Sequence, residues 1–212
     1  MGPAEKAYDI HKKALDIHSL YFSTCLSGDW QEGTTGPIHF GDVDPAIFEC
    51  VIEWLYSGVV SPNIKIDGKG PLYAYPEIYE LARRFQIRHL GNDAIDAFRT
   101  RGREEDCGVD AEVAAKIYEY ADQGSAFRQV VVASIAWDVV EKKRATGVDV
   151  LTSTFPLIAA DALKVIAESI ANEHDENFRL ASPFSKDRWD ECNYHDHAAG
   201  EGCEAVRLRR AM

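Results

Sequence analysis

Apolar residues recur along the chain at the spacing of amphipathic helices, three or four positions apart, which places them on one helix face. Such stretches cover about residues 13–28, 44–57, 75–85, 90–98, 113–120, 127–135 and 158–170. One short stretch, Pro37–Phe40, alternates partly and predicts a brief strand. The pattern therefore predicts a mainly α-helical fold with a minor α+β character.

One helix carries clear signals at both ends. Asp44 precedes Pro45, and this pair is typical of a helix start. The Asp side chain accepts hydrogen bonds from the unpaired amides of the first turn, and proline lacks the N–H group that would have no partner at the first position. Gly58 lies just past the end of the same apolar stretch, where a left-handed residue commonly ends a helix.

Breaks in the periodicity divide the chain into three parts. The charged, glycine-containing stretch Arg99–Gly108 is the best candidate for a boundary, and apolar periodicity is lost from about Asp175. We expect a first domain over residues 1–103, a helical extension over 104–175 and a polar tail over 176–212.

Several short motifs then occur in a recognisable order. They are Asp9–Leu15 with Ser19–Phe22, Gly41–Phe48, Trp54–Gly58 and Leu81–Ile87. In order and spacing they resemble the BTB/POZ domain over about residues 8–100. The resemblance implies a BTB/POZ-like helical cluster with a small sheet remnant. It also implies that the domain binds other proteins. Tyr118 and Phe127–Asp138 are similar to the helical extension of fungal BTB-containing proteins.

The resemblance is incomplete at the N-terminus. Only eight residues precede Asp9, whereas family members carry a helix and two strands there, which build much of the family's swapped dimer interface. Either the sequence is an incomplete version of the protein or this member has lost those elements. We therefore expect an N-terminally shortened domain whose strand edge is exposed, and homodimerisation in the family manner stays open.

Charge and cysteine content exclude several classes of protein. The formal net charge is −12, and a nucleic-acid-binding protein would present a basic face. No apolar run approaches the roughly 20 residues of a membrane span, and no secretory signal begins the sequence. The five cysteines are too few for a disulfide scaffold. We expect a protein of the cytoplasm or nucleus.

Motifs of catalysis are missing from the sequence. It has no phosphate-binding glycine loop, dinucleotide fingerprint or nucleophile elbow. Cys25 and Cys50 fall on predicted apolar helix faces, as small buried residues do. His11 matches a structural histidine of the family whose upstream acidic partner is absent here. The protein is therefore expected not to be an enzyme, and a metal-dependent hydrolase in the tail is a remote alternative.

The triplet Trp30-Gln31-Glu32 is a candidate partner-binding site. It follows the first helical stretch, at the position where the resemblance places the hydrophobic-x-acidic triplet of cullin-binding BTB domains. An exposed aromatic side chain can anchor in a partner's pocket while the acid selects orientation. The implied partners are a cullin scaffold, for a substrate adaptor of a ubiquitin ligase, or another BTB protein. Alternatively, Trp30 packs on its own domain.

Four potential metal ligands gather in the tail: Cys192, His195, His197 and Cys203. Two thiolates and two imidazoles match the tetrahedral shell that structural zinc prefers. Their spacing matches no major zinc-finger class, so a disordered acidic tail is the alternative.

The zinc hypothesis makes a direct prediction. Purified protein should contain zinc, and the Cys192→Ser/Cys203→Ser double variant should not. Binding should weaken as pH falls, because protons compete for thiolates and imidazoles. Loss of the site should leave the helical core folded, since the apolar periodicity ends at Ile170. Equal zinc in both proteins, or none in either, would exclude the site.

Overall fold

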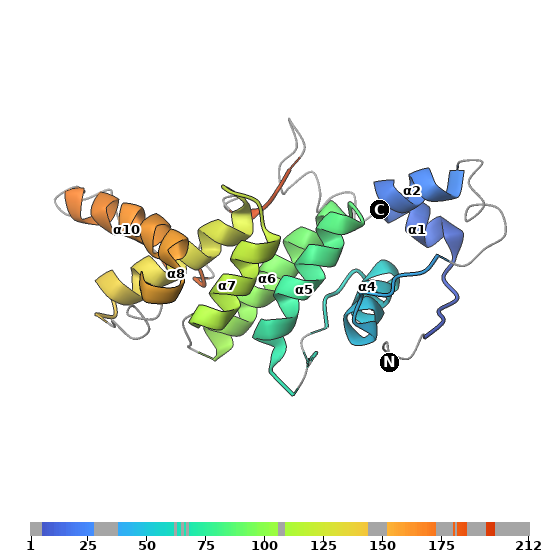
Figure 1. Ribbon diagram of the computed structural model, residues 1–212, viewed down its shortest axis with the longest axis horizontal. Helices are drawn as coiled ribbons and strands as arrows, with labels where there is room; N and C mark the ends of the chain where they lie inside the picture. Colours follow the sequence, from blue (N-terminus) through green and yellow to red (C-terminus); the bar gives the residue numbers. More distant parts are fainter. Residues whose placement is uncertain are drawn as a thin grey trace. The chain divides into compact units, whose positions relative to one another are not determined.

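The computed structural model describes residues 6–27, 38–61, 63, 64, 66, 68–105, 109–143, 152–172, 180, 182–185 and 194–197 (Figure 1). These residues are mainly helical, as the periodicity predicts. The helices are α1 (Lys12–His18), α2 (Leu20–Ser27), α4 (Pro45–Ser57), α5 (Pro71–Arg84), α6 (Arg88–Glu104), α7 (Ala111–Tyr120), α8 (Ala126–Val140) and α10 (Pro156–Ala171).

The described part of the chain forms no sheet, so the expected sheet remnant is not found there. Ile38, His39 and Phe40 are not in a strand, and the nearest approach to β structure is an isolated bridge between Ile66 and Lys69. The brief strand predicted over residues 37–40 is therefore wrong for 38–40, while Pro37 lies outside the described residues. A strand needs a neighbour to satisfy its backbone; here Phe40 instead packs among aromatic rings.

The first helical stretch is two helices rather than one. Ser19 has an extended backbone and separates α1 from α2. Its buried hydroxyl accepts a hydrogen bond from the Phe22 amide at 3.0 Å, so Ser19 caps the start of α2. The periodicity could not show this break, because apolar residues continue on both sides of it.

Helix α4 begins and ends where its sequence signals predict. The Asp44 side chain accepts from the Ala46 amide at 2.7 Å, and Pro45 is the first helical residue. Gly58 ends the helix in the left-handed conformation, at φ 70°. Both predictions for this helix are confirmed.

Helix α5 ends in a Schellman motif without a glycine. The Ile87 amide donates to the Ala82 carbonyl at 2.7 Å and the Gln86 amide to the Arg83 carbonyl at 3.0 Å. Gln86 therefore takes the left-handed position, at φ 53°. The motif Leu81–Ile87 is this helix end, and its apolar members are buried.

Five aromatic rings form the core against which these elements pack: Tyr21, Phe22, Phe40, Phe48 and Phe85. Phe85 is fully buried and lies within 6.2 Å of each of the other four, measured between ring centroids. Arg84 covers the cluster from outside. Its guanidinium lies 5.5 Å from the centre of the Phe40 ring and forms a two-point ion pair with Asp42, at 2.6 and 3.1 Å.

Helix α6 continues through most of the expected boundary. The stretch Arg99–Gly108 was expected to be a break, yet it is helical as far as Glu104. Arg101 stabilises this last turn through an ion pair with Glu105 at 2.5 Å. Arg99 and Gly102, which made the stretch look like a polar break, are both buried. Charge content misled the prediction because two of these residues face inward.

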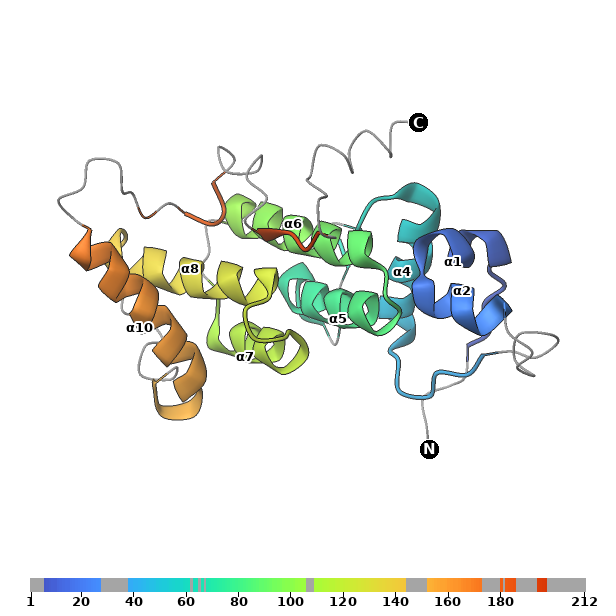
Figure 2. The same cartoon turned by 90° about the horizontal axis from the view of Figure 1, so that it is seen from above.

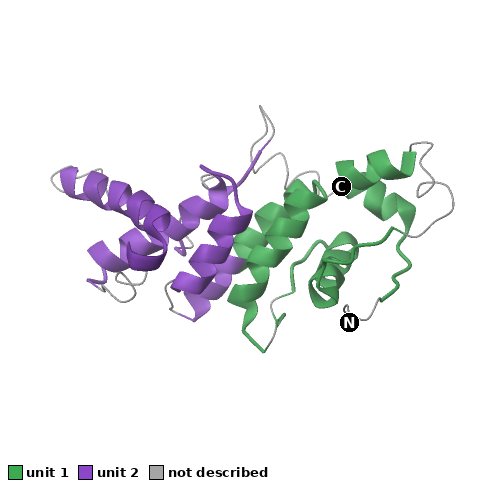
Figure 3. Cartoon of the chain, viewed as in Figure 1, with its two compact units in different colours: residues 1–97 green, residues 98–212 purple. Residues whose placement is uncertain are grey.

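The chain divides into two compact units, residues 1–97 and 98–212, and the division falls inside α6 (Figure 3). In unit 1, α1 packs on α2 and α4, and α4 packs on α5. In unit 2, α8 packs on α7 and α10, as the view in Figure 2 also shows. Asp110 and Ser125 cap α7 and α8 through their side chains.

Candidate functional site

Five of the seven predicted site residues lie outside the described residues: Trp30, Gln31, Glu32, Cys192 and Cys203.

Two of the four potential zinc ligands are described. The His195 and His197 rings are edge to face, 5.9 Å apart between centroids. Within the described ranges, no three His, Cys, Asp or Glu side chains converge as a metal site would require. Because two of the four ligands lie outside those ranges, the zinc site stays a prediction.

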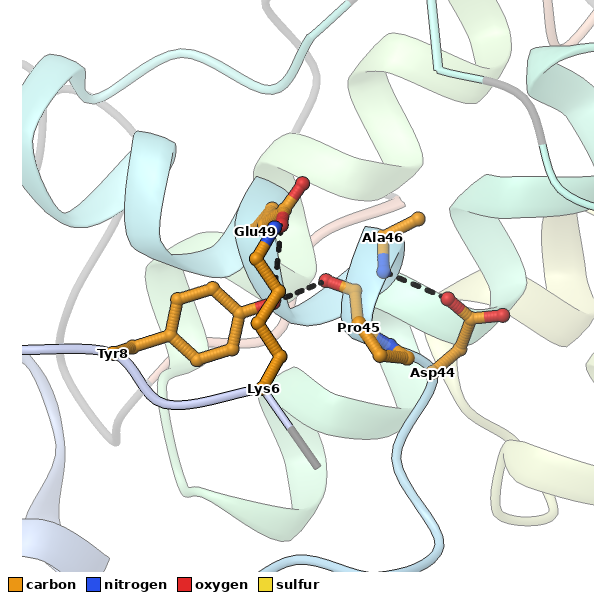
Figure 4. A network of polar contacts seen from close by, with 6 residues as sticks. All are labelled: Lys6, Tyr8, Asp44, Pro45, Ala46 and Glu49. Carbon is orange, nitrogen blue, oxygen red and sulfur yellow. Dashed lines mark hydrogen bonds and ion pairs between the residues drawn. The ribbon is translucent and has the colours of Figure 1, made fainter. Parts of the chain in front are cut away.

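A polar network joins the N-terminal segment to the start of α4 (Figure 4). Lys6 forms an ion pair with Glu49. The Tyr8 hydroxyl lies 3.0 Å from the Glu49 carboxylate and 3.3 Å from the Pro45 carbonyl oxygen. These contacts hold a segment without secondary structure against α4, and the Tyr8 ring packs edge to face on Phe48 at 5.4 Å.

The charges of this network stabilise each other. Hydrogen bonds from Lys6 and then Tyr8 lower the pKa of Glu49, and the bond to Glu49 raises the pKa of Lys6. Burial and then the Glu49 hydrogen bond raise the pKa of Tyr8. All three groups keep their usual charge at neutral pH, so the network anchors the segment and provides no acid or base tuned near neutrality.

Two histidines attach α1 to α4. His11 Nδ1 lies 2.9 Å from the Tyr56 hydroxyl, and the His11 amide donates to the same oxygen at 3.1 Å. His18 packs edge to face on Trp54 at 5.2 Å, and the Trp54 indole donates to Asp93 at 2.8 Å. The sequence matched His11 to a structural histidine of the family that lacks its acidic partner here, but it could not supply Tyr56, because the two residues are 45 positions apart.

The cysteines of unit 1 are free thiols, and Cys50 is buried on α4. Burial, followed by the nearby charges of Glu53 and Glu49, raises the pKa of Cys50 to about 11. A thiol with so high a pKa is protonated at neutral pH and is a poor nucleophile. Its environment fits the packing role expected from its helix face.

Large apolar side chains are exposed on unit 1 around the junction of α1 and α2. Ile17 is 65% exposed and Leu20 is 66% exposed. Lys13 and Asp16, of opposite charge, are exposed on the same helix as Ile17. We call these four residues the α1–α2 patch; it combines two exposed apolar side chains with one positive and one negative charge.

In unit 2, a polar network joins three helices. The Tyr118 hydroxyl of α7 donates to Asp161 of α10 at 3.1 Å, and Lys164 binds the same carboxylate at 2.9 Å. Arg128 of α8 donates to the Tyr118 carbonyl at 2.6 Å, and its guanidinium lies 4.4 Å from the centre of the Tyr118 ring. Burial and then the Asp161 charge raise the pKa of Tyr118 well above its usual value.

An open hollow of about 560 Å³ lies beside this network. Residues of α7, including Glu112 and Lys116, line one side, and residues 154–158 line the other. Leu157, one of these lining residues, is 73% exposed.

Sequence reasoning missed a set of residues in unit 2. Arg99, Gly102 and Phe184 come together where a part of the polar tail meets α6. Phe184 is buried although it lies beyond the last periodic apolar stretch. The available signals were a glycine inside a helix and a lone aromatic residue in a polar tail, and neither indicates a partner in sequence.

In comparison with known proteins, residues 4–101 match the family model of the BTB/POZ domain. The chain is similar to the mouse (Mus musculus) Rho-related BTB domain-containing protein 1, at 29% identity over 84 residues, or 40% of this chain and 11% of the mouse protein. The chain thus spans about a tenth of the length of that relative. No solved structure matches the chain. Among the described residues, no helix is long and apolar enough to cross a membrane.

Proposed function

Because residues 4–101 match the BTB/POZ domain, a protein-interaction module, we propose that the protein is a non-enzymatic adaptor that associates through this domain. The family match is the observation that carries the proposal. The α1–α2 patch supports it, because its two exposed apolar residues, Ile17 and Leu20, lie at the same helix junction, and apolar patches of neighbouring residues mark interaction sites more often than single exposed residues do.

The partner that the patch fits best is a second BTB-type domain, in the first instance a second copy of this chain. BTB domains generally associate with themselves as well as with other proteins. Lys13 and Asp16 give the patch both signs of charge, so it is electrostatically compatible with its own copy.

Substitution in the patch tests this proposal. Sedimentation of the wild-type chain over roughly 1–100 µM, a range typical of weak contacts, should show a monomer–dimer equilibrium. Leu20→Asp should raise the dissociation constant of the dimer at least ~10-fold, because a charge replaces a side chain that is buried on association.

The matched control is Leu157→Asp, which places the same charge at an exposed leucine of unit 2. This control should associate like the wild type. A wild-type chain that stays monomeric throughout the range, or two variants that behave alike, would contradict the proposal.

A narrower function is that of a substrate adaptor for a cullin-type ubiquitin ligase. The feature that favours it is the triplet Trp30-Gln31-Glu32, through its resemblance to the hydrophobic-x-acidic triplet of cullin-binding BTB domains. Trp30 would provide the buried anchor and Glu32 the charge that selects orientation.

A binding assay with a purified cullin N-terminal region tests this narrower function. The wild-type chain should bind, and Trp30→Ala should reduce the affinity at least ~10-fold, as loss of an anchor residue does. Val59→Ala, which shortens an exposed apolar side chain elsewhere on unit 1, should leave the affinity unchanged. Absence of binding, or equal affinity of wild type and Trp30→Ala, would exclude the cullin role while leaving the self-association proposal standing.

A further inference from the structure

A short segment of the C-terminal tail lies against α6 in unit 2. Figure 2 shows residues 182–185 and 194–197, in orange and red, near this helix. Three residues of α6 make the contacts: Phe98, Arg99 and Gly102. We call this surface the α6 site, and the described tail residues 182–185 and 194–197 the strap.

The first contact recognises backbone and an aromatic face. Arg99 is fully buried, and its Nε donates to the Pro183 carbonyl at 2.7 Å. Its guanidinium also lies 4.8 Å from the centre of the Tyr194 ring. A charge-assisted hydrogen bond and a cation–π contact from one arginine thus bind two points of the strap that are 11 positions apart.

The second contact is a fit of shape. A Cβ atom at Gly102 would lie only 2.8 Å from Cε1 of Phe184, so the ring occupies the space that the glycine leaves. Phe98 lies 6.4 Å from the Phe184 ring and 5.1 Å from Phe127 of α8, both between centroids. The phenylalanine of the strap therefore lies in a recess formed by Gly102 and Phe98 of α6, with Phe127 of α8 behind Phe98.

The strap presents these groups from a turn of its own. The Ser182 hydroxyl accepts from the Phe184 amide at 3.2 Å, and the Ser185 amide donates to the Ser182 carbonyl at 3.0 Å. This local turn holds the Pro183 carbonyl and the Phe184 ring ready for the α6 site. Preorganisation of this kind lowers the ordering cost of a bound peptide.

From this geometry we infer that the α6 site is a peptide-binding site, which the chain's own strap occupies. Its ligand class is a turn-forming Pro-Phe peptide with a tyrosine further along. In trans it takes a peptide of the same chemistry once the strap leaves. The inference goes beyond the proposed function, because it concerns unit 2 and does not depend on the partner of the BTB/POZ domain.

The tether decides which ligand prevails. A segment on the same chain acts at an effective concentration of the order of millimolar. A separate peptide at micromolar concentration therefore competes poorly with an intact strap, and binds only when the strap is weakened.

The experiment uses the full chain and a fluorescently labelled peptide with the sequence of residues 180–197. In Phe184→Ala/Tyr194→Ala, which weakens the strap but leaves the α6 site intact, the peptide should bind at least ~10-fold more tightly than in the wild type. Adding Arg99→Met to this double variant should abolish the gain. Equal binding in all three proteins, or none in any, would overturn the inference.

Glycine substitutions provide a matched pair on the same helix. In the Phe184→Ala/Tyr194→Ala background, Gly102→Ala should weaken binding of the labelled peptide, because its Cβ fills the space that the phenylalanine ring of the peptide needs. Gly91→Ala should not, since a Cβ there meets its neighbours at an ordinary 3.7 Å.

Circular dichroism of each variant measures folding separately. If both Phe184→Ala/Tyr194→Ala and the single variant Tyr194→Ala lose their helical signal, the strap is an inseparable part of the core, and the inference is wrong. Retained helicity in either variant allows the binding comparison to decide.

Discussion

Unit 1 depends on one buried hydroxyl group. Ser19 is 1% exposed, and its hydroxyl donates to the Phe85 carbonyl at 2.5 Å while accepting from the Phe22 amide. One side chain thereby starts α2 and joins it to the end of α5, 66 positions away. The Phe85 carbonyl faces Ser19 because the Schellman motif ends α5 there, and the Phe85 ring at the same residue centres the aromatic cluster. The short motifs at Ser19–Phe22 and Leu81–Ile87 are thus two halves of one contact.

The features that sequence could predict are those that depend on neighbouring residues. Asp44, Pro45 and Gly58 act within one helix, so their effects were readable and are confirmed. The break at Ser19 and the continuation of α6 to Glu104 were not readable, because they depend on partners far along the chain. Residues 38–40 alternate like a strand, but alternation cannot show whether a partner strand exists.

The candidate sites divide in the same way. Residue types suggested the zinc ligands and the Trp30 triplet, and both stay predictions. The resemblance of the C-terminal helices to the extension of fungal BTB-containing proteins stays a prediction as well. The α6 site could not be predicted, since Arg99 and Gly102 read as a polar break and Phe184 as a lone aromatic residue. What unites the two units is the use of single buried polar groups, Ser19 and Arg99, to bind backbone carbonyls of distant segments.

The most direct test of this account is the stability of Ser19→Ala, measured by urea denaturation of the full chain. The substitution removes a helix cap and leaves the buried Phe85 carbonyl without its donor, so we expect a loss of about 2–3 kcal/mol. Thr24→Ala removes an exposed hydroxyl of the same helix, which donates only to the Leu20 carbonyl, and should change stability by less than about 0.5 kcal/mol. A Ser19→Ala protein as stable as Thr24→Ala would contradict the central role of this contact.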